Sequence, residues 1–155
     1  MKIIYAALSF CMWLFFLDCS QPVKTTTAAK KGDTFIYEFS EESEGYTIKV
    51  TPRTIYLRIG TYDKTLASDT FAFPEARYDS FVTALSALHI VNRENIMNRC
   101  IGSASHSLQL YAGTGREVKG YRVSCGDEKF GNLAGDVAAA AALFNALIPD
   151  LYDRV

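Results

Sequence analysis

The amino-acid sequence predicts an α+β fold: an antiparallel sheet, in the element order ββββαββα, with two amphipathic helices packed on one face. Apolar residues alternate with polar ones in short segments separated by turn-forming residues, which is typical of strands that bury one face. In two longer segments the apolar residues recur every three or four positions instead, which is typical of amphipathic helices. Because the strands are grouped and do not alternate strictly with helices, an antiparallel sheet is favoured.

Four strands are expected before the first helix, because four segments place aromatic or aliphatic residues at every second position. Turn-forming residues at Ser40–Gly45 and at Pro52 separate the first three of these segments. The expected strands are Thr34–Phe39, Tyr46–Val50, Ile55–Ile59 and Asp69–Phe73.

The first helix is expected from Pro74 to about Ile90. Proline is tolerated in a first helical turn because its missing N–H would have no partner there, and Glu75 places a negative charge near the positive end of the helix dipole. The apolar stripe of this helix consists of Tyr78, Phe81, Val82, Leu85 and Leu88.

Two further strands are expected after a polar connection at Asn92–Ser105. The first lies around Leu108–Leu110, and the turn Gly113-Thr114-Gly115 leads into the second, Val118–Cys125. Alternation in the second strand places three residues on one face that is predicted to point toward the core. These residues are Tyr121, Val123 and Cys125.

The last element is expected to be a helix from Leu133 to about Ile148. Its alanine run, Ala138–Ala142, has high helix propensity, and Pro149 follows its end. One apolar stripe runs along it, so a core helix is favoured over a membrane span. The stripe comprises Leu133, Val137, Ala141, Phe144, Leu147, Ile148 and Leu151.

The N-terminal segment has the three parts of an export signal. Lys2 supplies a positive charge, Ile3–Leu17 is an unbroken run dominated by apolar residues, and polar residues follow from Asp18. A membrane-spanning helix needs about 20 apolar residues, so cleavage of this shorter run is favoured over retention as an anchor. The expected organisation is a signal peptide at 1–18, a flexible tether at 19–33 and a single α+β domain at 34–155.

The stretch Phe15-Phe16-Leu17-Asp18-Cys19-Ser20 resembles the lipobox of a bacterial lipoprotein precursor, in which signal peptidase II cuts before a cysteine that carries lipid. The family pattern prefers a small residue directly before the cysteine and an aliphatic residue three positions before it, where this chain has Asp18 and Phe16. The resemblance implies a lipid on Cys19 and a membrane-anchored protein of the cell envelope, facing the periplasm or the exterior. Cleavage near Ser20 or Ala29, which would give a soluble periplasmic or secreted protein, is the alternative.

The remaining cysteines suggest a disulfide. Cys11 would leave with the signal and Cys19 would carry lipid, which leaves Cys100 and Cys125 together in an oxidising compartment. In the entropic model, a bond closing this loop would stabilise the fold by about 3.5 kcal/mol. Two reduced core cysteines are the alternative. Zinc is disfavoured because no histidine pair accompanies the two cysteines.

Composition excludes one functional class and supports no specific enzyme class. The chain has 16 Lys and Arg against 17 Asp and Glu, without the basic surplus of an electrostatic nucleic-acid binder. The serine-rich stretch Ser103–Ser107 contains His106, but neighbours in a strand point to opposite faces and would not form a nucleophile–base pair. His89 lies beside the apolar stripe of the first helix and is expected to be a boundary residue or a core side chain with a hydrogen-bond partner. No catalytic residue, cofactor or metal site is therefore predicted.

Two sets of loop residues are expected to be solvated turn residues. One is Gly113–Arg116, which joins two strands and is not followed by the helix of a phosphate-binding loop. The other is a group of acidic residues without the spacing of a calcium loop. It comprises Glu41, Glu42, Glu44, Asp63 and Asp69.

These observations favour a non-catalytic protein-binding module of the envelope, of an inhibitory or immunity type, that meets its partner through a sheet face, hairpin tips or an edge strand. Interfaces favour tyrosine, and Tyr46, Tyr56, Tyr62 and Tyr111 are expected at or near outward-facing positions. The alternatives are a small envelope hydrolase whose site is assembled in space, and a structural envelope lipoprotein.

Overall fold

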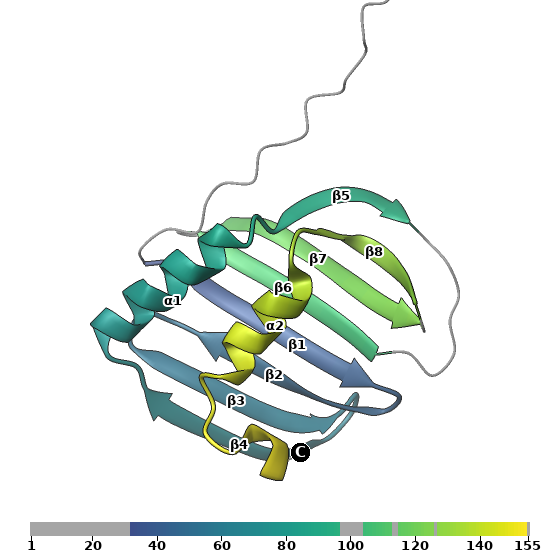
Figure 1. Cartoon of the computed structure of the whole chain (residues 1–155). Helices are drawn as coiled ribbons and strands as arrows, with labels where there is room; N and C mark the ends of the chain where they lie inside the picture. The colour runs from purple at the N-terminus through teal and green to yellow at the C-terminus, as the bar shows by residue number, and fades with distance from the viewer. Residues whose placement is uncertain (1–31, 97–103, 113–114, 126, 155) are drawn as a thin grey trace, which may run out of the picture.

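Eight strands and two α-helices make up the chain over residues 32–96, 104–112, 115–125 and 127–154, the parts that the computed structural model describes (Figure 1). A short 3-10 turn, η1, follows the second helix at Leu151–Asp153. The helices are α1, Glu75–Ala87, and α2, Val137–Asn145. The strands are β1 Thr34–Glu41, β2 Glu44–Val50, β3 Thr54–Thr61, β4 Thr65–Ala72, β5 Val91–Ile96, β6 Ala104–Ala112, β7 Gly115–Cys125 and β8 Glu128–Ala134.

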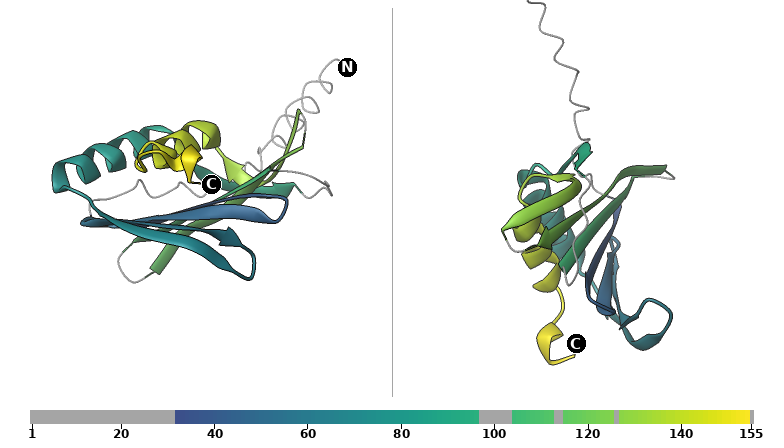
Figure 2. Two further views of the ribbon diagram at one scale, coloured as in Figure 1. Left: turned by 90° about the horizontal axis from the view of Figure 1, so that it is seen from below. Right: turned by 90° about the vertical axis from the view of Figure 1, so that its right-hand side faces the viewer.

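The strands form one antiparallel sheet in the order β4-β3-β2-β1-β6-β7-β8-β5. Two meanders therefore meet at the central pair β1 and β6, and β5 joins beyond β8. Helix α1 leads from one edge strand, β4, to the other edge strand, β5. Both helices lie on the same side of the sheet in Figure 2, and no element among the described residues covers the other side.

The core forms where one face of the sheet meets the helices. Alternate residues of β1, β2 and β3 point to this face, as their alternating burial shows. Phe81 of α1 lies between Phe35 of β1 and Phe144 of α2, with ring centroids 5.6 and 5.1 Å apart and edge-to-face geometry. Fully buried large side chains of this core are Phe35, Tyr37, Ile48, Val50, Leu57, Tyr78, Leu133, Phe144 and Leu151.

The α+β class and the antiparallel sheet with two helices are confirmed, and helix α1 begins and ends within the predicted span. The predicted order ββββαββα is wrong, because β5 and β8 were not recognised as strands. Strand β5 lies at the sheet edge and has the sequence VNRENI, so no buried face imposes apolar alternation on it. Strand β4 begins at Thr65, earlier than predicted. The first part of the strand was missed because its residues up to Thr70 are all exposed, so that no buried face gives them an apolar alternation.

The predicted start of the second helix at Leu133 is wrong, because Leu133 and Ala134 are the last two residues of strand β8. Gly131 adopts a positive φ of 105°, and this irregularity disrupts the two-residue alternation between Phe130 and Leu133. Both residues are buried, yet they are three positions apart, which matches helical spacing. Helix α2 instead begins at Val137, where Asp136 caps it by accepting a hydrogen bond from the backbone N–H of Ala139 at 3.0 Å.

The predicted core face of β7 is also wrong. Tyr121 is 37% exposed, and Val123 and Cys125 are only partly buried and lie outside the core cluster. The register with β6 places Gly120 opposite Leu108, so that the core-facing side of β7 carries glycine there. Leu133 fills the space above this glycine, since a Cβ atom at Gly120 would lie 2.4 Å from the Leu133 side chain.

Gly131→Ala should destabilise the fold by at least about 2 kcal/mol, because the positive φ is unfavourable for alanine and its Cβ would lie 2.2 Å from the Tyr121 carbonyl oxygen. The measurement is urea unfolding of the variant and the wild type. Gly32→Ala is the matched control: Gly32 also has a positive φ, but nothing lies within 4 Å of the added Cβ. Equal losses in the two variants would contradict the steric part of the explanation.

Candidate functional site

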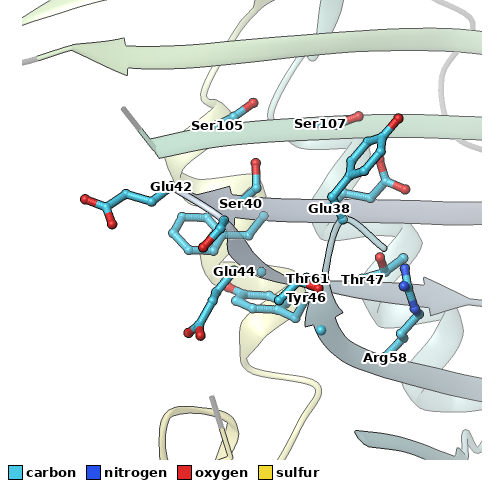
Figure 3. A pocket seen from close by; sticks show the side chains of 15 residues that line it. Glu38, Ser40, Glu42, Glu44, Tyr46, Thr47, Arg58, Thr61, Ser105 and Ser107 are labelled. Carbon is cyan, nitrogen blue, oxygen red and sulfur yellow. The ribbon is translucent and has the colours of Figure 1, made fainter. Parts of the chain in front are cut away.

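A hollow of about 490 Å³ opens on the helix-free face of the sheet (Figure 3). Its floor is formed by β1, β2, β3 and β6, and its rim by the β1–β2 and β3–β4 turns. The alternation of the strands explains its polarity: the residues between the buried core positions point to this face and are hydrophilic or small. The rim includes Glu42, Glu44 and Tyr62.

The floor consists of two rows of residues that run across the strands. In the first row, Glu38 lies opposite Ser107 on one side and Thr47 on the other, and Thr47 lies opposite Arg58. The second row runs in the same direction one pleat away, and two of its four members are glycines. These members are Ser105, Ser40, Gly45 and Gly60. A Cβ atom at Gly45 or Gly60 would lie 2.2 Å from a backbone carbonyl oxygen, so the chain passes close to both glycines.

The polar groups of the floor are largely unused by the protein itself. Within the described residues, no side-chain hydrogen bond or ion pair engages Glu38, Ser40, Thr47, Ser105 or Ser107. The Nε of Arg58 donates to the Thr65 hydroxyl at 2.7 Å, which directs the guanidinium toward β4. Glu38, which is half-buried, therefore presents a carboxylate without a local cation to a space bordered by hydroxyls. Chemically, this arrangement can accept hydrogen bonds from a cationic or strongly donating ligand group.

The tip of the β1–β2 hairpin adds negative charge beside the hollow. Glu41 and Glu44 lie directly opposite each other in the strand register, and Glu42 occupies the turn between them. Like charges in opposite positions destabilise a strand pair. Glu42 also adopts a left-handed φ of 54°, which is unfavourable for a residue with a side chain. The tip therefore combines repulsion and backbone strain at one exposed place.

A separate polar cluster lies on the helix-covered face. The Tyr37 hydroxyl is 2.9 Å from Nδ1 of His106, and the two rings are stacked. Burial raises the pKa of Tyr37 far above its ordinary value, with a further contribution from Tyr46, so Tyr37 stays neutral. Burial also lowers the pKa of His106, and the nearby charge of Arg122 lowers it further. The neutral imidazole is therefore the favoured form, and its tautomer decides which of the two groups donates the hydrogen bond.

This cluster continues toward the C-terminus from Tyr46, which also lines the hollow. The Tyr46 hydroxyl donates to Asn145 Oδ1 at 2.8 Å, and the Asn145 amide donates to the Tyr152 hydroxyl at 3.3 Å. Burial lowers the pKa of Arg122, and Arg93 adds to the effect. Ser105 and Ser107 line the hollow on the opposite face of β6 from His106, so the structure does not bring this histidine to those hydroxyls.

The residues singled out from the sequence are found in different places. Cys19, Ser103 and Cys100 lie outside the described residues, and so do the side chains of Tyr111 and Arg116. Cys125 ends β7 and is partly buried. His89 is exposed and follows the end of α1 with a left-handed φ of 49°.

The four tyrosines predicted to face outward do not form one cluster on the hollow. Tyr46 is buried in the core, which contradicts the prediction, because it belongs to the alternation that faces the helices. Tyr56 is 38% exposed on β3, and Tyr62 is fully exposed in the β3–β4 turn. Tyr46 and Tyr62 both line the hollow, Tyr46 from the buried side of β2 and Tyr62 from the rim.

Sequence reasoning did not identify the floor residues Glu38, Thr47 and Arg58 as a site. Their signal was present only as polar residues at alternate strand positions, which any solvent-facing side of a sheet would show. Their grouping depends on strand order and register, since β1 and β6 are separated by a long stretch of chain.

The described residues provide neither a metal-binding cluster nor a membrane-spanning helix. They contain no group of three or more His, Cys, Asp or Glu side chains placed to hold a metal ion. None of the helices among them is long and apolar enough to cross a bilayer.

The unfolding free energy should decrease as the pH falls below about 6.5, the ordinary pKa of histidine, because the unfolded chain then binds a proton at His106 that the folded protein disfavours. Unfolding in urea at several pH values between 5 and 8 measures this slope. His106→Asn should reduce the slope, whereas His89→Asn, which removes the exposed histidine, should leave it unchanged. An equal slope in the His106→Asn variant would contradict the assignment.

Comparisons of the chain with protein-family models, with curated proteins and with solved structures each found no match. The site is therefore interpreted from its own geometry and chemistry.

Proposed function

We propose that this protein is an exported, non-catalytic binding module of the cell envelope, held at a membrane by lipid on Cys19, that recognises a basic surface of a partner protein. The hollow of the helix-free face and the β1–β2 hairpin tip form the recognition surface. An inhibitory or immunity-type role follows if the bound surface belongs to an enzyme or toxin. The observation that carries the proposal is Glu38, a half-buried carboxylate. Its neighbours in the hollow are hydroxyl groups, which do not neutralise its charge.

The charge balance of the recognition surface supports a basic partner. Glu38, Glu42 and Glu44 line the hollow together with a single cation, Arg58, whose Nε is engaged by Thr65. A cationic group of a partner would neutralise Glu38 and relieve the repulsion between Glu41 and Glu44. Features that cost the isolated protein stability and would be compensated in a complex are typical of binding surfaces.

The chemistry of the hollow supports binding over catalysis. A nucleophilic hydroxyl needs a base within hydrogen-bond reach and a third group that orients the base. Ser105 and Ser107 line the hollow without a histidine among the lining residues, and His106 is engaged by Tyr37 on the other face of the sheet.

Glu44→Lys provides a sharp test, because it should affect stability and binding in opposite directions. Glu44 lies opposite Glu41, so a lysine at position 44 would replace a repulsive pair of like charges with an attractive pair. This change should stabilise the fold by a few tenths to about 1 kcal/mol. The same change should weaken partner binding by at least about ten-fold, and wild-type binding should weaken with salt.

The measurement is affinity capture of a partner from envelope extract, followed by titration of the identified partner and by urea unfolding of each bait. Glu94→Lys on the distant edge strand β5 makes the same charge change and should bind like the wild type. Absence of a stoichiometric basic partner, or equal binding by the Glu44→Lys variant, would refute the proposed recognition surface.

The proposed export is consistent with the position of Cys125. The segment that contains Cys100 joins Ile96, which pairs with Gly131 of β8, to Ala104, which pairs with Ser124 of β7. Ser124 directly precedes Cys125. Cys100 lies four positions before Ala104 in the sequence, and four such steps of the chain span at most about 14 Å. This reach supports the proposed disulfide between Cys100 and Cys125, which an oxidising compartment would favour.

Intact-mass measurement of the protein purified from envelopes should find a chain that begins at lipid-modified Cys19 and is lighter by two hydrogen atoms than its reduced form. Replacing residues 1–19 with a signal peptide that is cleaved without lipid modification should move the protein from the membrane fraction to the soluble fraction. An unmodified chain that retains Met1, or membrane retention of the protein with the replaced signal, would contradict the anchoring mechanism.

A further inference from the structure

The two edges of the sheet are protected to very different degrees. Strand β5 is short, carries Arg93 and Glu94, and pairs irregularly with β8 between Asn92 and Ile96. Strand β4 on the opposite edge has eight residues, TLASDTFA, without proline, lysine or arginine. Its single charge, Asp69, forms an ion pair with Arg154 from the C-terminal segment. Charges, proline and irregular pairing normally prevent edge strands from pairing with other chains, and β4 has little of this protection.

Exposed large hydrophobic side chains gather at the same edge. The described residues include five of them, and only Tyr121 lies on the other half of the sheet. Leu66 belongs to β4 and is 56% exposed, and Tyr62 lies in the turn that leads into this strand. Tyr56 lies on the neighbouring β3, opposite Thr70 of β4. Tyr152 belongs to the C-terminal segment that Arg154 holds against Asp69.

We propose that β4 is a self-association edge: it pairs antiparallel with β4 of a second copy of this chain and joins the two sheets into one. The backbone N–H and C=O groups on the outer side of β4 would then be satisfied by the second copy. Exposed tyrosine and leucine side chains around the strand would contribute buried area at the margins of the contact. The proposal depends on the β4 edge and stands independently of what the hollow binds.

The sequence of β4 fits a two-fold symmetric pairing. Residues directly opposite each other must point to the same face of a joined sheet, so symmetry centres the contact on one residue. Centring it on Ser68 places a hydroxyl opposite the same hydroxyl of the second copy. Ala67 then lies opposite Asp69 of the second copy, so that the two Asp69 carboxylates, each paired with its own Arg154, do not face each other.

Charges beyond the strand permit the pairing with a second copy. The β4 strand is preceded by Asp63 and Lys64 and followed by Glu75 and Arg77. In the antiparallel arrangement, the beginning of one strand lies beside the end of the other. Each end carries one charge of each sign, so a second copy meets no net charge repulsion at either end.

This pairing has a geometric consequence for the helix-free face. The two-fold axis stands perpendicular to the joined sheet, so both helix-free faces point in the same direction. Two copies of the hollow would then open on one continuous surface. A partner with two basic sites would bind such a dimer with avidity, without any additional contact in either hollow.

The self-association can be measured on the protein with the replaced signal, which keeps the complete mature domain and avoids detergent. Light scattering during size-exclusion chromatography and sedimentation over a range of concentrations should find a dimer. Ser68→Glu is the decisive variant, because it places two carboxylates opposite each other on the symmetry axis. Within one copy, the new carboxylate lies opposite Arg58 and should not weaken the fold.

We expect Ser68→Glu to weaken dimerisation by at least about ten-fold while the unfolding midpoint in urea is maintained or raised. Ser80→Glu, at an exposed position of α1, is the control and should dimerise like the parent protein. Hydrogen exchange of the β4 amides should slow as the concentration rises. A monomer at all concentrations, equal dimerisation of the Ser68→Glu variant, or a different protein's strand on β4 would each overturn the proposal.

Discussion

The packing of Phe81 against the sheet is the contact on which the rest of this structure depends. Its ring fills the angle between Phe35 of the central strand β1 and Phe144 of α2, so three elements distant in sequence share one aromatic cluster. Phe144 in turn stacks on Tyr37, with ring centroids 5.1 Å apart. Burial of large aromatic side chains is the strongest available source of stability in a domain of this size. The cluster therefore determines which face of the sheet the helices cover.

Covering one face has consequences for the other. Every residue of β1, β2 and β3 that alternates with the core positions must tolerate water, and on β1 and β3 this places Glu38 and Arg58 on the helix-free face. Gly45 and Gly60 also line the hollow on that surface. A side chain at either glycine would clash with the backbone, since the added Cβ would lie 2.2 Å from a carbonyl oxygen of the neighbouring segment. The close backbone approach next to the two turns therefore requires glycine at both positions.

The face under the helices contains a polar group that the aromatic cluster has to accommodate. His106 is enclosed by Tyr37 and Phe39, and its hydrogen bond to the Tyr37 hydroxyl replaces one that water would provide. An unsatisfied polar group at this depth would cost about 1–3 kcal/mol. The two sides of β6 therefore have different roles. Residues on the helix-covered side pack in the core and have hydrogen-bond partners there, while Ser105 and Ser107 on the other side remain available to a ligand.

The sequence by itself determined those parts of this protein in which the spacing of apolar residues along the chain matches the face that is buried. The alternation in β1 to β3 and the stripe of α1 were readable because one face of each element packs against the core. The failures arose where burial does not produce that period: at β5, an edge strand with polar residues, and at β8, where the positive φ of Gly131 interrupts the alternation. The candidate site was beyond reach for a different reason. Glu38, Arg58 and Ser107 become neighbours only through strand order and register. Strand order and register result from pairing between segments far apart in the chain, and the local sequence of one segment does not indicate which other segment it will pair with.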